Sequence, residues 1–279
     1  MRKYSDDRQK QNRIGRIMPL LGFILAVLLL TGCGEKSADI VRQSTEAEDK
    51  AQQTKTDALE PDQMQETGFA GESARDAEIA FGLLQADNPD IFGWLYIPGT
   101  AIDDPVLQSE QADDFYESHN AYGQTDEGGA IYIELANLKS MCDFNTVLHG
   151  KTGAEETGLF ADLYQFADPD FFEEHEKAYL YLDGNALTYE IVAAYERENT
   201  SLLRSYNFTY VDGCQKFLDD LYGIRDMTMN LREGWEGITP YHFLITLTTQ
   251  KEEQPDRQFV VIAILTEDAA GTIDRIVAE

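Results

Sequence analysis

Basic residues are scarce in this sequence of 279 residues, which has 22 lysines and arginines against 51 aspartates and glutamates. Six of the basic residues but only two of the acidic ones fall in the first 33 positions, which leaves 16 basic and 49 acidic residues and a net charge of −33 for the remainder. Such an acidic surface repels nucleic acid phosphates and anionic lipid headgroups. Nucleic-acid binding is therefore excluded as a function.

Cysteines are also few, and only Cys33, Cys142 and Cys214 are present. Cys142 and Cys214 could form a disulfide in an exported protein, but two cysteines carry no spacing signature, and we expect two unpaired thiols. The chain has no CxxC pair and no histidines at the spacing of zinc ligands, and its acidic clusters lack the loop spacing of a calcium site. We therefore expect no metal and no other cofactor.

The first 33 residues have the composition of an export signal. A basic leader precedes an apolar run at 17–30, and small residues follow, as in a secretory signal peptide. The ending Leu30-Thr31-Gly32-Cys33 resembles a bacterial lipobox, which implies cleavage before Cys33 and a lipid on its sulfur. The alternative is an uncleaved membrane anchor, but the apolar run is short of the roughly 20 residues that a spanning helix needs. We expect a lipid-anchored protein at the extracellular face of the cell membrane.

The rest of the chain divides into three stretches that differ in amino-acid composition. Residues 34–72 are polar and have no aromatic residue before Phe69, so they cannot bury enough apolar surface to fold alone. We interpret them as a flexible acidic tether between the signal peptide at 1–33 and a folded domain at 73–268. Residues 269–279 are interpreted as a C-terminal tail.

Short apolar runs bounded by turn residues predict eight strands in the folded domain. They lie at 91–97, 104–108, 129–133, 145–149, 178–182, 186–195, 243–249 and 258–265. The predicted helices are an amphipathic one at 73–86, which Asn88-Pro89 ends, and shorter ones at 112–116, 159–164, 170–175 and 211–222. Eight short strands with few helices predict a mainly β fold, a closed or half-closed β-barrel with short peripheral helices and an N-terminal helix.

Several stretches in order resemble class B sortases, the cysteine transpeptidases that join surface proteins to Gram-positive cell walls. The resemblance covers nearly all of 88–265, and the long connection at 196–240 is similar to the insertion of that class. It implies a sortase-like eight-stranded barrel. The stretches that carry it are Ile102-Asp-Asp-Pro-Val-Leu-Gln108, Gly128-Gly-Ala-Ile-Tyr-Ile133, Asn145-Thr-Val-Leu-His-Gly150 and Phe243-Leu-Ile-Thr-Leu-Thr-Thr-Gln250, followed by Asp256-Arg257.

The same resemblance implies that two catalytic residues are missing. Where the family has its nucleophilic cysteine, at the end of Leu-Ser-Thr-Cys, this chain has Gln250, and the position of the family histidine holds Lys151. The arginine that steadies the substrate is present as Arg257. An amide cannot replace a thiolate as nucleophile, so the standard sortase mechanism is excluded.

Substitutes for the lost groups are conceivable. His149 precedes Lys151 by two residues, and because side chains alternate along a strand, both could face the same cleft. Thr248 and Thr249 adjoin Gln250, although a threonine nucleophile needs an aligned base, and ordinary strand positions are the simpler interpretation. Cys142 lies too far from the strand end to take over, and Cys214 is expected to be a small buried residue of a helix.

Three functions stay open. The first is a binding module whose cleft, through Arg257, Lys151, Gln250, Thr248 and Thr249, holds an extended peptide or a carboxylate without cutting it. Its partner would be a sorting-signal-like peptide, a surface or pilus protein, or an active sortase. The second is a cysteine-independent or weakly active peptidase that uses His149, Lys151 and a hydroxyl. The third is a structural surface lipoprotein, in which Arg257 serves only as an ion-pair partner.

Overall fold

A computed structural model describes residues 79–274 of this protein, apart from 154–157, 236 and 252. All of them fall within the second of two units of the chain, Gln63–Glu279. The predicted signal peptide, the lipidation site Cys33, the tether and the start of the predicted domain lie outside the described residues, and their boundaries stay predictions. Within the described stretches, every helix is too short or too polar to cross a lipid bilayer.

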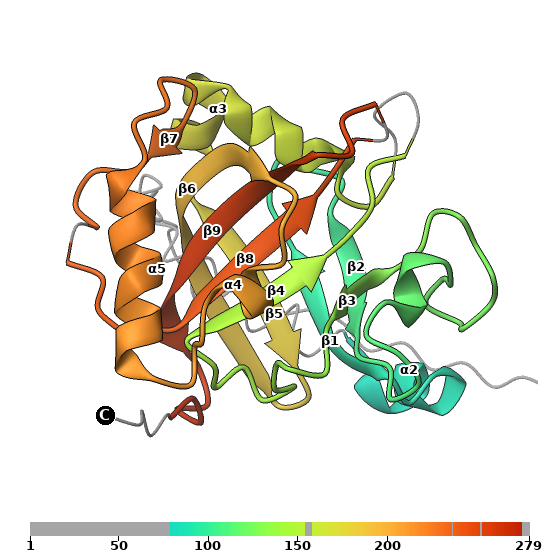
Figure 1. Ribbon diagram of the computed structural model, residues 1–279. Helices are drawn as coiled ribbons and strands as arrows, with labels where there is room; N and C mark the ends of the chain where they lie inside the picture. The colour runs from blue at the N-terminus through green and yellow to red at the C-terminus, as the bar shows by residue number, and fades with distance from the viewer. Residues whose placement is uncertain (1–78, 154–157, 236, 252, 275–279) are drawn as a thin grey trace, which may run out of the picture. The chain divides into compact units, whose positions relative to one another are not determined.

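Eight strands close into a barrel (Figure 1). Neighbouring strands pair in the order β5–β1–β2–β3–β4–β8–β9–β6, and pairing of β5 with β6 completes the ring. The pairs β2–β3 and β4–β8 are parallel, and the other pairs are antiparallel. The bounds are β1 Ile91–Tyr96, β2 Asp103–Leu107, β3 Ile131–Ile133, β4 Asn145–His149, β5 Lys177–Leu182, β6 Asn185–Glu198, β8 Leu244–Thr249 and β9 Arg257–Asp268. The prediction of a mainly β, closed eight-stranded barrel is confirmed.

The sequence did not predict two short elements. The two-residue strand β7 (Asn230–Leu231) pairs with Ala193 and Ala194 of β6, and the short helix α4 (Leu202–Ser205) follows β6. Both lie in the long connection between β6 and β8. Such short elements form because neighbouring parts of the fold hold them, so their own pattern is too weak to reveal them.

The predicted helices are present in the described residues, although two are of the 3₁₀ type. The prediction of a helix at 73–86 is wrong for Ile79 and Ala80, which are not helical, and its part at 73–78 lies outside the described residues. Helix α2 (Phe81–Asp87) ends before Asn88-Pro89, as expected from the clash of proline with a preceding helical residue. Helix α3 begins at Pro169, where Asp168 caps it by accepting bonds from the backbone amides of Asp170 and Phe171 at 2.9 and 3.1 Å. The remaining helices are η1 (Phe115–Glu117), η3 (Ala161–Ala167) and α5 (Val211–Gly223).

Both faces of the central strands are buried, which explains their nearly continuous apolar sequences. On β8, Ile245 and Leu247 point into the barrel, whereas Leu244 belongs to a second cluster outside it. That second cluster joins the outer face of β4, β8 and β9 to the apolar side of α5. Figure 1 shows α5 alongside this part of the barrel. The helix contributes Cys214, Phe217, Leu218 and Leu221.

Buried tyrosines predict a loss of stability in alkali. Burial raises the pKa of Tyr195 to about 12, and burial together with a hydrogen bond to Asp220 raises the pKa of Tyr206 to about 12. The pKa of an unfolded tyrosine is about 10, so the unfolded state releases its protons first as the pH rises. We expect the free energy of unfolding in urea to decrease above pH 10, and less steeply in Tyr195→Phe. If the free energy of unfolding stayed constant up to about pH 11.5, roughly 1.5 pH units above the pKa of an unfolded tyrosine, this prediction would be wrong.

Candidate functional site

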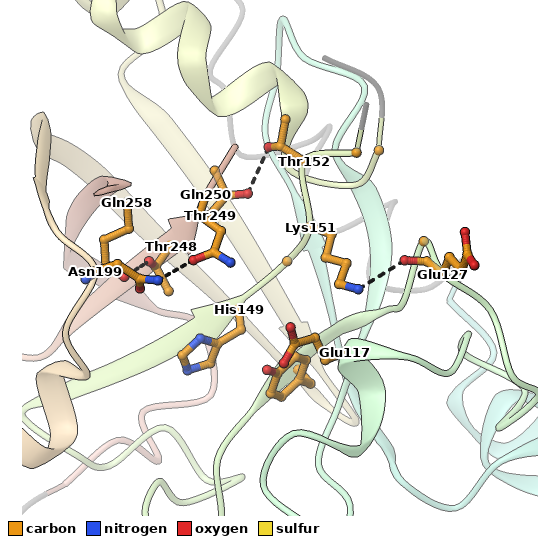
Figure 2. A pocket seen from close by; sticks show the side chains of 15 residues that line it. Glu117, Glu127, His149, Lys151, Thr152, Asn199, Thr248, Thr249, Gln250 and Gln258 are labelled. Atoms are coloured by element: carbon orange, nitrogen blue, oxygen red, sulfur yellow. Dashed lines mark hydrogen bonds between the residues drawn. The ribbon is translucent and has the colours of Figure 1, made fainter. Parts of the chain in front are cut away.

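A cleft of about 640 Å³ opens where the parallel strands β4 and β8 end (Figure 2). Because the two strands run in the same direction, their carboxyl ends meet at one edge of the barrel, with His149 opposite Thr248. The end of β6, the start of β9 and the connection between β2 and β3 complete the walls. The lining residues are Glu117, Glu127, Gly128, Tyr132, His149, Gly150, Lys151, Thr152, Gly153, Gly158, Asn199, Thr248, Thr249, Gln250 and Gln258.

Two buried hydroxyl contacts stabilise the base of the cleft. The hydroxyl of Thr248 donates a hydrogen bond to Gln258 Oε1 at 2.8 Å. The hydroxyl oxygens of Thr249 and Thr152 lie 2.8 Å apart, and both residues are buried. The second contact ties the end of β8 to the segment that follows β4. These threonines therefore bond to the protein itself, as expected of buried polar groups.

The amide of Gln250 lies at the exposed end of β8. Its Oε1 accepts a hydrogen bond from Asn199 Nδ2, just after the end of β6. Asn199 Nδ2 also donates to the backbone oxygen of Pro255 at 2.9 Å, in the connection between β8 and β9. A single asparagine thus joins two segments that meet only in the folded barrel.

His149 and Lys151 both line the cleft but point in different directions (Figure 2). The His149 ring stacks on Tyr132, with centroids 5.0 Å apart. Its Nε2 lies 3.2 Å from Glu134 Oε1, and hydrogen bonding to His149 lowers the pKa of the Glu134 carboxyl. Lys151 Nζ donates to the backbone oxygen of Glu127 at 3.2 Å.

Gly150 separates His149 from Lys151 and directly follows the end of β4. A Cβ atom at this position would lie 2.6 Å from the buried ring of Phe160, a separation that side chains do not adopt. The glycine therefore allows the end of β4 to pack directly against the segment that leads into η3. This close packing determines where Lys151 leaves the strand.

Five of the six residues predicted for the cleft line it, namely His149, Lys151, Thr248, Thr249 and Gln250. Arg257 does not belong to the lining, and its guanidinium Nη2 lies 3.8 Å from Glu196 Oε2. The ion-pair interpretation of Arg257 thus matches its position better than the cleft role.

The two remaining cysteines lie away from the cleft lining. Cys142 is in the loop before β4, and its thiol is not part of a disulfide. Its Sγ lies 3.4 Å from the backbone oxygen of Ser140. Cys214 is buried on α5, as predicted, with Sγ at 3.4 Å from the backbone oxygen of Phe208.

Sequence reasoning missed several lining residues. Asn199 follows β6 in a stretch without any motif, and only the barrel brings it to the end of β8. Gln258 adjoins Arg257 on β9 and faces the opposite side, so the expectation that Arg257 lies in the cleft pointed away from Gln258. Glu117 and Glu127 enter through the connection between β2 and β3, whose path depends on tertiary packing, and Tyr132 enters from β3, where it pairs with His149 of β4.

The comparisons with known proteins agree with this fold. No family model matches the chain. The chain is 29% identical over 185 residues to a sortase B of Listeria monocytogenes, which covers 66% of this chain and 73% of that protein. It is 25% identical over 140 residues to a sortase B of Staphylococcus aureus, which covers 50% of this chain and 57% of that protein.

Solved structures show the same likeness. The crystal structure of Clostridium perfringens sortase B superposes with a TM-score of 0.60 at 25% identity, covering 67% of this chain and 100% of that one. A Staphylococcus aureus sortase B–substrate complex gives a TM-score of 0.58 at 22% identity, covering 71% of this chain and 91% of that one.

Proposed function

Because this chain belongs to the class B sortase family, we propose that it is a sortase-like domain that binds an extended peptide without cleaving it. The observation that carries the proposal is the state of Gln250. This residue stands where the family resemblance implies the nucleophilic cysteine, and its amide oxygen is already bonded to Asn199. A carboxamide supplies no thiolate for attack on a peptide carbonyl.

Lys151 supports the same proposal. It stands where the resemblance implies the family histidine, and its ammonium group donates to the backbone oxygen of Glu127. A lysine does not supply the imidazole that serves as the general acid in the family. The cleft thus has neither the nucleophile nor the usual acid of the reaction.

Peptide binding is supported by the character of the cleft. The exposed side-chain amide of Gln250 lies at its base, and an amide can pair with the backbone of an extended chain. One related sortase B has been solved in complex with its substrate. We propose that the corresponding cleft of this chain keeps the binding step of that activity after losing the covalent one.

A membrane location completes the proposal. The basic leader, the apolar run and Cys33 support export and lipid anchoring, which would place the cleft at the extracellular face of the membrane. Mass spectrometry of the mature N-terminal peptide tests this, because a diacylglyceryl group on Cys33 changes its mass. An unmodified or uncleaved N-terminus would disprove the lipid anchor.

A weakly active enzyme is the second candidate, and His149 is the observation in its favour. Its ring lines the cleft, and its Nε2 lies 3.2 Å from Oε1 of the Glu134 carboxylate. The nearby hydroxyl of Thr248, however, donates to Gln258. This candidate therefore has a base without an aligned nucleophile.

The deciding experiment combines turnover and binding. The full chain is incubated with an array of threonine-containing hexapeptides, each capped at both ends, and with an amine acceptor. The Listeria monocytogenes sortase B serves as the active control. We expect binding of some peptides but no cleavage or transfer above background, because no nucleophile lies in the cleft.

Two results would contradict the proposal. Cleavage that His149→Ala abolishes would establish the second candidate, a rewired active site. If neither turnover nor binding is observed, a structural lipoprotein is the function that remains.

A further inference from the structure

The polar groups of the cleft are arranged so that one hydrogen-bond donor points into the space that a ligand would occupy. We propose that Gln250 recognises a backbone carbonyl oxygen of a neutral or basic stretch of extended peptide by donating from Nε2, and that Asn199 is the positioning residue that orients it. This inference rests on the proposed function, since it names the chemistry by which the same cleft binds a peptide.

The orientation of the Gln250 amide follows from a backbone carbonyl. The oxygen of Pro255 can only accept, so the atom of Asn199 that lies 2.9 Å from it must be the donor Nδ2. The same Nδ2 bonds to Gln250, so the partner atom on Gln250 must be the acceptor Oε1. The Nε2 group of Gln250 therefore points away from Asn199 and into the cleft, as Figure 2 shows.

The side-chain amide of Gln258 is oriented in the same way, but both hydrogens of its Nε2 group already have acceptors. Its Nε2 donates to the backbone oxygens of Glu198 and Thr200 at 3.1 and 3.0 Å, and its Oε1 accepts from Thr248. The hydroxyls of Thr249 and Thr152 bond to each other. One hydroxyl proton of that pair has no described acceptor, but both threonines are buried. Among the described side-chain amides of Asn199, Gln250 and Gln258, the exposed Nε2 group of Gln250 is the donor that no described acceptor satisfies.

The charges around the cleft restrict the ligand. Glu117 and Glu127 line the wall opposite the amides, and Lys151 is the basic residue of the lining, while Arg257 lies against Glu196. Two carboxylates against one ammonium group disfavour an acidic ligand or a terminal carboxylate. A carbonyl within a neutral or basic segment supplies the acceptor without that repulsion.

The test uses Gln250→Glu in the full chain. The new carboxylate keeps an oxygen for Asn199 but replaces the outward donor with an acceptor. We expect the affinity for the best-binding capped peptide of the array, measured by fluorescence anisotropy, to fall by about 10- to 100-fold. The control Gln111→Glu makes the same charge change at an exposed residue outside the cleft lining and should leave the affinity unchanged.

Binding of a basic capped peptide distinguishes the effect of losing the donor from the effect of adding a negative charge. If only electrostatics mattered, the new carboxylate would strengthen binding of a basic peptide, whereas loss of the donor weakens it. Unchanged or stronger binding in Gln250→Glu, with binding intact in the unsubstituted chain, would overturn this inference and spare the proposed function. No binding by the unsubstituted chain would overturn both.

The positioning role of Asn199 has its own measurement. In the unsubstituted chain, the side-chain Nε2 amide signals of Gln250 in nitrogen–proton NMR spectra should shift when the capped peptide binds. In Asn199→Ala the two signals should move before any peptide is added, because the amide is released, and peptide affinity should decrease about threefold to tenfold. Signals that are the same with and without Asn199 would disprove the positioning role.

Discussion

The double substitution Gln250→Cys with Lys151→His is expected to give the full chain peptide cleavage about 100-fold above the unsubstituted chain. Both positions line the same cleft, so the introduced thiol and imidazole would face the same space. The thiolate would attack the peptide carbonyl, and the imidazolium would give its proton to the leaving amine. The resulting thioester would then be opened by water or by an amine.

Each single substitution controls for this result. Gln250→Cys alone supplies a nucleophile without an acid, and Lys151→His alone supplies an acid without a nucleophile, so neither should exceed a small part of the gain. Cleavage would be followed with the best-binding capped peptide carrying a fluorophore and a quencher. If the double variant binds this peptide but does not cleave it, loss of the two catalytic groups is not sufficient to explain inactivity, and the ion pair of Arg257 with Glu196 becomes the next position to change.

Arg232→Met is expected to lower the free energy of unfolding by about 3 kcal/mol. The guanidinium of Arg232 is 9% exposed and donates to the backbone oxygens of Phe172 at 2.6 Å and Ile191 at 2.9 Å. It also lies 4.8 Å from the Phe172 ring centre and contacts Glu173 and Glu176. These contacts hold the segment after β7 against α3 and β6, and methionine would leave both carbonyls without their donor.

Thermal unfolding measures this effect directly. A loss of about 3 kcal/mol in a domain of this size lowers Tm by roughly 6–12 °C. Arg204→Met is the matched control, since Arg204 is exposed on α4, and its Tm should change by less than about 2 °C. If the Tm of Arg232→Met differed from that of the unsubstituted chain by less than about 2 °C, the buried guanidinium would contribute no net stability.

Most of the barrel could be predicted because the strands are apolar on both faces. Continuous runs such as the one that forms β8 mark strands whose two faces are both buried, and the structure confirms this with Ile245 inside the barrel and Leu244 against α5. The elements that were missed, β7 and α4, are too short to carry a pattern of their own. Their positions depend on contacts such as those of Arg232, which no local rule predicts.

The cleft shows the same division between local and tertiary information. The residue types at 149, 151 and 248–250 follow from the sequence, and so does the absence of cysteine and histidine where the family resemblance implies them. Only the tertiary structure decided that Asn199 holds Gln250, that Glu134 contacts His149, and that Arg257 lies near Glu196 rather than in the cleft. The physical reason is that strand patterns are local, whereas a side-chain contact depends on which distant segments barrel closure brings together.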